Sequence, residues 1–312
     1  MFTKLTAVMI GCCLCSLVLA TEPLRVMTWN VQRGAKHFDD GPAKTVRVIR
    51  DSRADIVLMQ ESYENDALGS KLGAWVGKQL GWQTHQGDSP HLCILSRYPI
   101  TETFSHAPWH GVGAKIRLPG GQEILVWSCW IDYRAFMGQR LIDKPGSTDA
   151  ELLACETTDS GRAQQTRDLL ARLKALGQLE SKLPLLVGGD WNCPSHLDYT
   201  EAVKDLHQGR VLPLPSSLLF EKEGFTDAYR VVHPDVRKHP GLTWSPLVKV
   251  NDESRNAEAQ DRIDRLYLRN GGFHPVAATV FPVREEDSAI PQSKRIFPSD
   301  HAAVLIELEY RK

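Results

Sequence analysis

Five short segments of the sequence carry carboxylate, amide or imidazole side chains where an apolar run ends or begins. The side chains belong to Asn30, Glu61, the pair Asp190 and Asn192, Asp264, and the pair Asp300 and His301. Neighbouring strands of a sheet end at one edge, so we expect these side chains to converge in space. Carboxylate and amide oxygens suit Mg²⁺, Mn²⁺ or Ca²⁺ better than zinc. The pattern therefore predicts a site for a hard divalent cation.

Each side chain taken alone also has a structural explanation. The alternatives are a turn cap at Asn30, a strand exit at Glu61, an Asx turn at Asp190 and Asn192, a surface ion pair of Asp264 with Arg262, and a polar strand start at Asp300. The interpretation as a metal site depends on the whole series. If every side chain had only its structural role, all of these coincidences would have to occur in one chain and in this order.

The segments between these residues alternate between strand and helix patterns. Strands are predicted at residues 24–30, 56–59, 92–95, 114–118, 123–131, 185–187, 265–268 and 303–309, and helices at 44–53, 65–80 and 162–179. Irregular structure is predicted for residues 132–160, 245–260 and 281–298, which are rich in Pro, Gly, Ser and charge. Because no repeat or linker-like composition separates these elements, we expect one α/β domain over residues 21–312.

The polar series resembles, in order, the motifs of the endonuclease/exonuclease/phosphatase superfamily, the DNase I-like phosphoesterases. The matching motifs are Trp29-Asn30, Gln60-Glu61, Gly189-Asp190-Trp191-Asn192, Arg262-Ile263-Asp264 and Ser299-Asp300-His301. The resemblance runs from residue 24 to about residue 309. It implies a four-layer α/β sandwich, in which two mixed β-sheets pack face to face with helices outside. It also implies a hydrolase of phosphate esters that uses Mg²⁺, Mn²⁺ or Ca²⁺.

The same resemblance implies which residues hold the metal. Glu61 would be the principal ligand, with Asn30 and Asp300 near the ion. A bound cation of this kind places charge on the phosphoryl oxygens and helps the departing oxygen by Lewis acidity.

The remaining motif residues would be catalytic by this resemblance. Asp190 would orient or deprotonate the attacking water, and Asn192 would hold a phosphoryl oxygen. His301 would contact the phosphate, and Asp264 would fix its ring. The residue types suit these roles, because a carboxylate can act as a general base. A histidine held by a carboxylate is biased toward the cation and stabilises developing negative charge.

One position departs from the family pattern. Trp130 stands where relatives carry a histidine, and an indole N–H can donate a hydrogen bond but cannot accept or transfer a proton. Three alternatives follow. Trp130 binds the phosphate as a donor only, another side chain such as Tyr133, His91 or His110 takes over the role, or Trp130 is plain core. Arg162 begins the strongest amphipathic helix, and it is either a candidate for phosphate recognition or a solvated helix start.

The first twenty residues have the pattern of a secretory signal peptide. Lys4 precedes an uncharged run from Leu5 to Ala20, which ends in Val18-Leu19-Ala20. The run of about 16 residues is short of the roughly 20 that span a bilayer comfortably. We therefore expect cleavage after Ala20, no transmembrane span, and a secreted or periplasmic protein. Lipoprotein anchoring at Cys12 and an uncleaved anchor are the alternatives.

Four cysteines follow this segment. Cys93 and Cys129 lie in apolar strand patterns and are expected to be buried free thiols. Cys155 and Cys193 lie in segments predicted to be loops and could pair with each other, since an oxidising compartment permits disulfides.

Composition limits the substrate only weakly. The 37 Lys and Arg residues nearly balance 38 Asp and Glu residues, so the chain has no global attraction to nucleic acid or anionic membranes. A charged fraction of 24% with balanced signs and 42% hydrophobic residues excludes a disordered chain. We expect a monomer that acts on a small or lipid-linked phosphate ester. A DNase- or RNase-like nuclease that binds nucleic acid is the first alternative, and a non-catalytic phosphate- or partner-binding module of the same fold is the second.

Overall fold

Short apolar runs rich in Val, Ile and Leu form the strands at the centre of the molecule, as the sequence predicts. The computed structural model describes residues 22–281 and 291–311. The strands of the two large sheets are β1 (Leu24–Asn30), β2 (Ile56–Gln60), β5 (Gln83–His85), β6 (Cys93–Ser96), β7 (Ile100–His106), β8 (Gly111–Arg117), β9 (Glu123–Trp130), β10 (Leu185–Asp190), β11 (Thr226–Asp227), β12 (Asp264–Arg269), β13 (Phe273–Phe281) and β14 (Ala303–Tyr310). Two further strands, β3 (Glu64–Asn65) and β4 (Ser70–Lys71), form a separate small hairpin.

The strands form two six-stranded mixed sheets. The first has the order β13-β14-β1-β2-β6-β5 and the second the order β11-β12-β10-β9-β8-β7. The central pairs β1–β2 and β9–β10 are parallel, whereas the neighbours β14 and β12 run antiparallel to β1 and β10. The parallel central pairs bring the ends of β1, β2, β9 and β10 to one side of the molecule.

The two sheets pack face to face around a shared apolar core. In β1, Val26 points into this core, whereas Met27 and Trp29 lie in the layer outside the first sheet, which is the alternation expected of a strand. The sheets approach closely at Gly188, where a Cβ atom would lie 2.7 Å from Leu58 Cδ1. A larger residue at this position would force the sheets apart.

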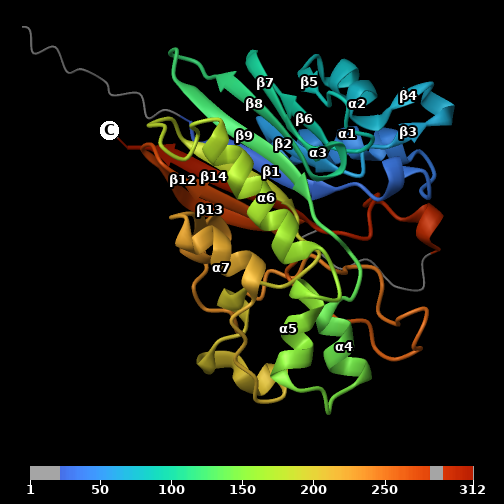
Figure 1. Ribbon diagram of the computed structural model, residues 1–312. Coiled ribbons are helices and arrows are strands. Elements are labelled where there is room, and N and C mark those ends of the chain that lie inside the picture. Colours follow the sequence, from blue (N-terminus) through green and yellow to red (C-terminus); the bar gives the residue numbers. More distant parts are fainter. Residues whose placement is uncertain (1–21, 282–290, 312) are drawn as a thin grey trace, which may run out of the picture.

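Helices cover the outer face of each sheet. The α-helices are α1 (Gly41–Ser52), α2 (Leu72–Leu80), α3 (Ala107–His110), α4 (Met137–Asp143), α5 (Asp149–Thr157), α6 (Arg162–Ala175), α7 (Pro215–Lys222) and α8 (Ala228–Val232). Helices α1 and α2 contribute apolar side chains to the layer outside the first sheet, and α6 and α7 to the layer outside the second. Figure 1 shows α6 crossing the outer face of its sheet, with α4 and α5 projecting beyond it. The predicted four-layer α/β sandwich is confirmed.

Two predicted segments differ from the structure. The helix predicted at 65–80 is shorter, because Asn65 caps a 3₁₀ turn (Asp66–Leu68) that Gly69 ends with a φ of 59°, and α2 begins only at Leu72. The segment 132–160 is not irregular, since it contains α4 and α5. Helix α5 begins with a capping box between Thr148 and Glu151, which is a start signal visible in the sequence.

The four described cysteines are all buried and free. Cys93 and Cys129 are therefore buried thiols as predicted. The disulfide considered between Cys155 and Cys193 is not formed, and Cys155 lies in helix α5 and not in a loop.

The N-terminal predictions lie outside the described residues. The signal peptide at 1–20 and the anchoring alternative at Cys12 both fall there. Within residues 22–281 and 291–311, none of the helices combines the length and apolar character needed to cross a bilayer.

Candidate active site

Strand register brings the predicted polar residues to one edge of the two sheets. Asn30, the last residue of β1, is paired in register with Gln60, so Glu61 emerges directly beside it. In the second sheet, Asp190 is flanked by Trp130 on one side and by Asp264 on the other. Residues far apart in the chain therefore meet because their strands end together.

The amide of Asn30 joins the two sheets at this edge. Its Nδ2 atom donates hydrogen bonds to Asp190 Oδ2 at 2.9 Å and to Glu61 Oε1 at 3.1 Å, and lies 3.5 Å from His301 Nε2. The side chain is fully buried, and Ser299 Oγ donates a 2.6 Å hydrogen bond to the carbonyl of Asn30. Asn30 therefore links the two sheets, and its Oδ1 also accepts a 3.0 Å hydrogen bond from the backbone N–H of Gln32, so it caps the following turn as well.

Asp264 and His301 form a buried pair. His301 Nδ1 lies 3.0 Å from Asp264 Oδ2, and Nε2 lies 3.9 Å from Asp190 Oδ2. Burial opposes the charged imidazolium, but the carboxylates of Asp264 and Asp190 outweigh it and raise the pKa of His301 to about 10. His301 is therefore a cation at neutral pH, with its charge held against two carboxylates.

Asp190 lies at the centre of the cluster and is almost completely buried. Burial raises its pKa to about 7, even though His301 and the hydrogen bond from Asn30 favour the carboxylate. The backbone N–H of Asn192 donates to Asp190 Oδ1 at 2.9 Å, and the Asn192 amide donates to the carbonyl of Ile131 at 2.8 Å. Asn192 has a φ of 48°, an uncommon backbone conformation for a residue that is not glycine. The turn therefore fixes Asn192 and Asp190 relative to each other.

Glu61 and Asp300 supply the remaining carboxylates. Asp300 Oδ1 is buried and has no hydrogen-bond partner among the described residues. Burial, together with the charge of Glu61 nearby, raises the pKa of Asp300 to about 6. A carboxylate oxygen that is buried without a partner is costly unless a cation or a donor meets it. The two side chains line the same cavity, and their hard oxygen donors fit Mg²⁺, Mn²⁺ or Ca²⁺.

The atoms of Asp190, Asp264 and His301 also lie close enough to one another to suggest a metal site, within 4.8 Å. One contact argues against that arrangement, because His301 Nδ1 and Asp264 Oδ2 lie 3.0 Å apart and are already paired with each other. We therefore treat Asp264 and His301 as a charged pair beside the metal position and not as its ligands.

Five residues of the cluster line a cavity of about 1500 Å³, namely Glu61, Asp190, Asn192, Asp300 and His301. Trp130 and Tyr133 both line this cavity, as do Trp109 and Tyr63. The Nε1 atom of Trp130 is buried without a hydrogen-bond partner, and its ring packs edge-on against His91 with the centroids 5.4 Å apart. Trp130 is thus a fixed, unsatisfied donor at the wall of the cavity.

Two of the side chains considered as replacements for Trp130 do not line the cavity. His91 is fully buried, and neither it nor His110 is part of the cavity lining, so neither ring reaches the space above Asp190. Tyr133 does line the cavity and is exposed.

Arg162 does not reach the cavity, contrary to the predicted substrate contact. Its guanidinium is fully buried and donates to the backbone carbonyls of Arg134, Ala135 and Cys155 at 2.5–3.1 Å. Because an arginine carries five donors in a fixed plane, it can tie together two ends of a loop. Arg162 therefore anchors the segment that carries α4 and α5. The solvated helix start is equally wrong.

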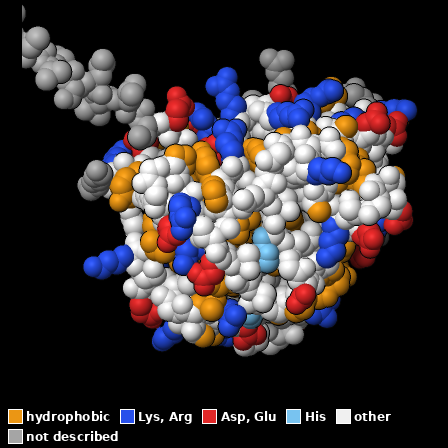
Figure 2. All heavy atoms as spheres, turned by 90° about the horizontal axis from the view of Figure 1, so that it is seen from above, with side chains coloured by type: hydrophobic (Ala, Val, Ile, Leu, Met, Phe, Trp, Pro, Cys, Tyr) orange, Lys and Arg blue, Asp and Glu red, His pale blue; other side chains and the backbone are white. Residues whose placement is uncertain are grey.

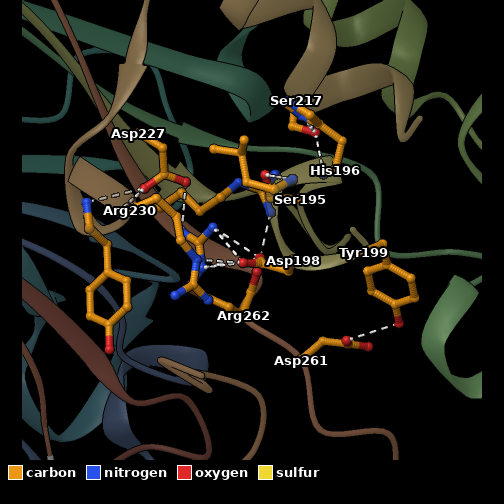
Figure 3. Close-up of polar contacts among 12 residues, drawn as sticks. Ser195, His196, Asp198, Tyr199, Ser217, Asp227, Arg230, Asp261 and Arg262 are labelled. Carbon is orange, nitrogen blue, oxygen red and sulfur yellow. Dashed lines mark hydrogen bonds and ion pairs between the residues drawn. The ribbon is translucent and has the colours of Figure 1, made fainter. Parts of the chain in front are cut away.

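The surface ion pair considered between Asp264 and Arg262 does not exist. Asp264 bonds to His301, whereas Arg262 points away and pairs with Asp198 at 2.9 Å and with Asp227 at 2.7 Å. Figure 3 shows this separate network, in which Arg230 joins Asp198 as well.

Sequence reasoning assigned no site role to several residues that position the cluster. Thr243 Oγ1 accepts hydrogen bonds from the backbone N–H groups of Ile263 and Asp264, both at 3.0 Å. Trp244 lines the cavity and packs on the His301 ring with centroids 4.9 Å apart. No local pattern signals the role of Thr243, since its partners are about twenty residues away in the chain.

Comparisons with known proteins agree with this geometry. An uncharacterized protein of Caenorhabditis elegans, F14F9.5, is 30% identical over 296 residues, which cover 92% of this chain and 91% of that protein. Among solved structures, TDP2 from C. elegans superposes with a TM-score of 0.58 at 17% identity, covering 94% of this chain and 76% of that one. The catalytic domain of human Nocturnin, solved with a bound sulfate anion, gives 0.54 at 16% identity, covering 93% and 95%.

The structural likeness supports the fold, and the sequence match supports the family. The profile of the Endonuclease/Exonuclease/phosphatase family matches residues 27–301, which include every residue of the cluster described above. The chain therefore belongs to the endonuclease/exonuclease/phosphatase family of metal-dependent hydrolases that cleave phosphate ester bonds.

Proposed function

We propose that this protein is an exported phosphodiesterase that hydrolyses a phosphate ester with the help of one hard divalent cation. The observation that supports the proposal most strongly is the excess of carboxylate groups at the strand ends, of which Asp190 and Asp264 are buried. Asp190, Asp264 and Asp300 stand with Glu61 around a single cationic side chain, His301. Such an excess, with the unpartnered Asp300 Oδ1, is best explained by a bound cation.

Glu61 and Asp300 would hold the cation, with Asn30 beside them. When bound, Mg²⁺ or Mn²⁺ would neutralise the non-bridging phosphoryl oxygens and assist the departing oxygen by Lewis acidity. Asn30 has both amide atoms engaged, since its Oδ1 accepts a 3.0 Å hydrogen bond from the backbone N–H of Gln32. Its role is therefore to orient Glu61 and Asp190, with direct ligation left to the carboxylates.

Asp190 would accept the proton of the attacking water. A pKa of about 7 suits this task, because the carboxylate is present in part at neutral pH and is more basic than an ordinary aspartate. Hydrogen bonds from Asn30 and from the backbone of Asn192 fix its orientation. His301, kept protonated by Asp264, would stabilise the negative charge that develops on the phosphoryl oxygens.

Trp130 and Asn192 would complete the phosphate contacts. Trp130 lines the cavity beside Asp190, and its Nε1 is buried without a hydrogen-bond partner, so a phosphoryl oxygen would satisfy this N–H after a small turn of the ring toward the cavity. Because the indole carries no titratable proton, this contact would orient the substrate without taking part in proton transfer. Asn192 would act through its fixed amide in the same way.

The substrate that we favour is a small phosphate diester, which would fit within a cavity of about 1500 Å³. A nuclease is the second candidate, because Trp109 and Tyr133 are exposed by 47% and 64% at this cavity and could stack on bases. Figure 2 shows one face of the molecule, over which Lys and Arg side chains are interspersed with Asp and Glu side chains.

Export rests on the composition of residues 1–20 alone. Expression of the full chain followed by N-terminal sequencing of the protein outside the cytoplasm would test it. We expect the mature protein to begin at Thr21, and an intact Met1 would contradict the proposal.

Hydrolysis of bis(4-nitrophenyl) phosphate tests the activity directly. We expect turnover with Mg²⁺ or Mn²⁺, its loss on adding EDTA, and its recovery when the metal is restored. Glu61→Gln should remove the turnover under all conditions. Turnover that EDTA leaves unchanged would contradict the metal-dependent mechanism, and no turnover with any divalent metal would favour a non-catalytic binding module.

A further inference from the structure

The basic side chains around the cavity differ in whether acidic neighbours already neutralise them. On the segment that carries α4, Arg134 pairs with Asp132 at 2.5 Å and Arg140 pairs with Asp159 at 2.7 Å. These two guanidinium groups line the cavity, but their charge is largely satisfied within the protein. Little of their positive charge is therefore available to a substrate.

The segment that follows β1 presents two cations that are not satisfied. Arg33 and Lys36 both line the cavity and are exposed. Among the described residues, neither side chain takes part in an ion pair or a hydrogen bond. Two positive charges on one short segment repel each other, and an anion placed between them would relieve this repulsion.

This segment is held rigidly against the metal-binding carboxylate. The backbone N–H of Arg33 donates to Glu61 Oε2 at 2.7 Å, and that of Gly34 donates to the Glu61 carbonyl at 2.8 Å. Asn65 Nδ2 donates to the Gly34 carbonyl at 3.1 Å. Arg33 and Ala35 have φ values of 47° and 55°, conformations that are strained for non-glycine residues and persist only where the surroundings impose them.

We propose that Arg33 and Lys36 form a second anion subsite, which binds a phosphate group of the substrate other than the one that is hydrolysed. The inference rests on the proposed function, because the scissile phosphate is placed at Glu61 and His301. It narrows the substrate class to esters that carry at least two phosphate groups. An ester with one phosphate and an uncharged or cationic remainder would leave both cations without a partner.

The subsite is matched to a phosphate group by charge and by donor geometry. Arginine offers a planar fork that binds two phosphate oxygens, and lysine adds a point charge. Because Arg33 is also linked through its backbone to Glu61, the second phosphate would lie close to the first. We expect both groups to belong to one small molecule or to adjacent positions of a chain.

Binding of diol bisphosphates tests the subsite without requiring turnover. The ligands are bisphosphates of straight-chain diols with about two to six carbons, each compared with the monophosphate of the same chain, and binding is measured by calorimetry on the full protein with Mg²⁺ present. A charge-assisted contact with two cations corresponds to at least a tenfold gain in affinity. We expect at least one bisphosphate to bind wild-type protein tenfold or more tightly than its monophosphate, and the gain to shrink as salt is added.

A double variant and a matched control assign the gain to these residues. Arg33→Gln combined with Lys36→Gln should reduce the gain to threefold or less, while the monophosphate still binds. The control combines Arg47→Gln and Lys78→Gln, which remove the same charge from exposed positions on α1 and α2, outside the cavity. It should keep the full gain.

Two results would overturn the subsite. Bisphosphates that bind no more tightly than monophosphates at any spacing would do so, as would a gain that survives in the double variant. Failure of the proposed function looks different, because then wild-type protein would not hydrolyse bis(4-nitrophenyl) phosphate whatever the bisphosphates do.

Discussion

Among the residues that the structure describes, two buried clusters of charged side chains differ in their balance of charge. In the network of Figure 3, Asp198 and Asp227 meet Arg230 and Arg262, so two carboxylates face two guanidinium groups. Asp227 also accepts the backbone N–H groups of Tyr229 and Arg230, which caps α8. Every carboxylate oxygen of this network has a partner within the protein.

The cluster at the strand ends is unbalanced. Its carboxylates outnumber its one cationic side chain, His301, and Asp300 Oδ1 has no partner among the described residues. It also opens into the cavity of about 1500 Å³, whereas Asp227 and Arg230 of the balanced network line a separate cavity of about 850 Å³. Burying charge is costly in both places. In the balanced network, ion pairs within the fold offset this cost. In the unbalanced cluster, a bound cation would have to offset it.

Removing one charge from the unbalanced cluster should give the largest effect on activity. We expect Glu61→Gln to lower kcat/KM on the order of 1000-fold, because the cation loses its main carboxylate. The melting temperature should stay within a few degrees of wild type or rise, since the variant relieves repulsion with Asp300. Kinetics on bis(4-nitrophenyl) phosphate and calorimetric melting measure the two. A large loss of stability in this variant would remove the contrast between the clusters.

In the balanced network we expect a large loss of stability and a much smaller loss of activity. Asp198→Asn leaves Arg230 and Arg262 without their shared carboxylate, and breaking a buried ion pair in this way costs about 3–5 kcal/mol. The free energy of unfolding in urea should fall by that amount. Activity per folded molecule should fall far less than in Glu61→Gln. Equal stability of the variant and the wild type would show that the network is not structural.

Arg162 gives a third, smaller test of what is structural. Replacement by Gln leaves the carbonyls that it bonds unsatisfied, so we expect a loss of about 1–3 kcal/mol in unfolding free energy. If the residue bound substrate, KM would rise while stability stayed constant. We expect instead a lower melting temperature, with KM within about threefold of wild type, a change of less than 1 kcal/mol.

The pH dependence of stability gives the smallest of the expected effects, and it tests the balanced network. Burial alone would raise the pKa of Asp198, but Arg262 and Arg230 outweigh it and hold that pKa below its usual range. A carboxylate with a lowered folded-state pKa stabilises the fold above its unfolded pKa of about 3.9, and this stability is lost as pH falls below that value. Acid unfolding followed by circular dichroism should therefore be steeper below about pH 4 in wild type than in Asp198→Asn. Acid-unfolding curves of equal steepness in wild type and Asp198→Asn would contradict the stabilising role assigned to Asp198.

Much of the site was predictable because it depends on strand ends. The apolar runs that precede Asn30, Glu61 and Asp190 identify strands, and strands of one sheet end together. The sandwich and the meeting of these side chains follow from that rule and from the family motifs. The roles assigned to the residues remain proposals, which the variants above address.

The parts that were not predictable depend on contacts between distant segments. Arg162 looked exposed because helix periodicity places it at a helix start, and nothing local shows that residues 134, 135 and 155 fold over it. Arg262 stands two residues from Asp264 but precedes the start of β12, and its side chain belongs to a different network. The unpaired state of Arg33 and Lys36 is likewise a property of the whole surroundings and not of their own sequence.

Calorimetric titration with Mn²⁺ tests the central claim most directly. If the unbalanced cluster exists to hold a cation, wild-type protein should bind Mn²⁺ at one site, and Asp198→Asn, which disturbs only the balanced network, should bind it in the same way. Glu61→Gln should lose the binding. Wild-type protein that binds no divalent cation, or Glu61→Gln protein that binds it as tightly as wild type, would contradict the account.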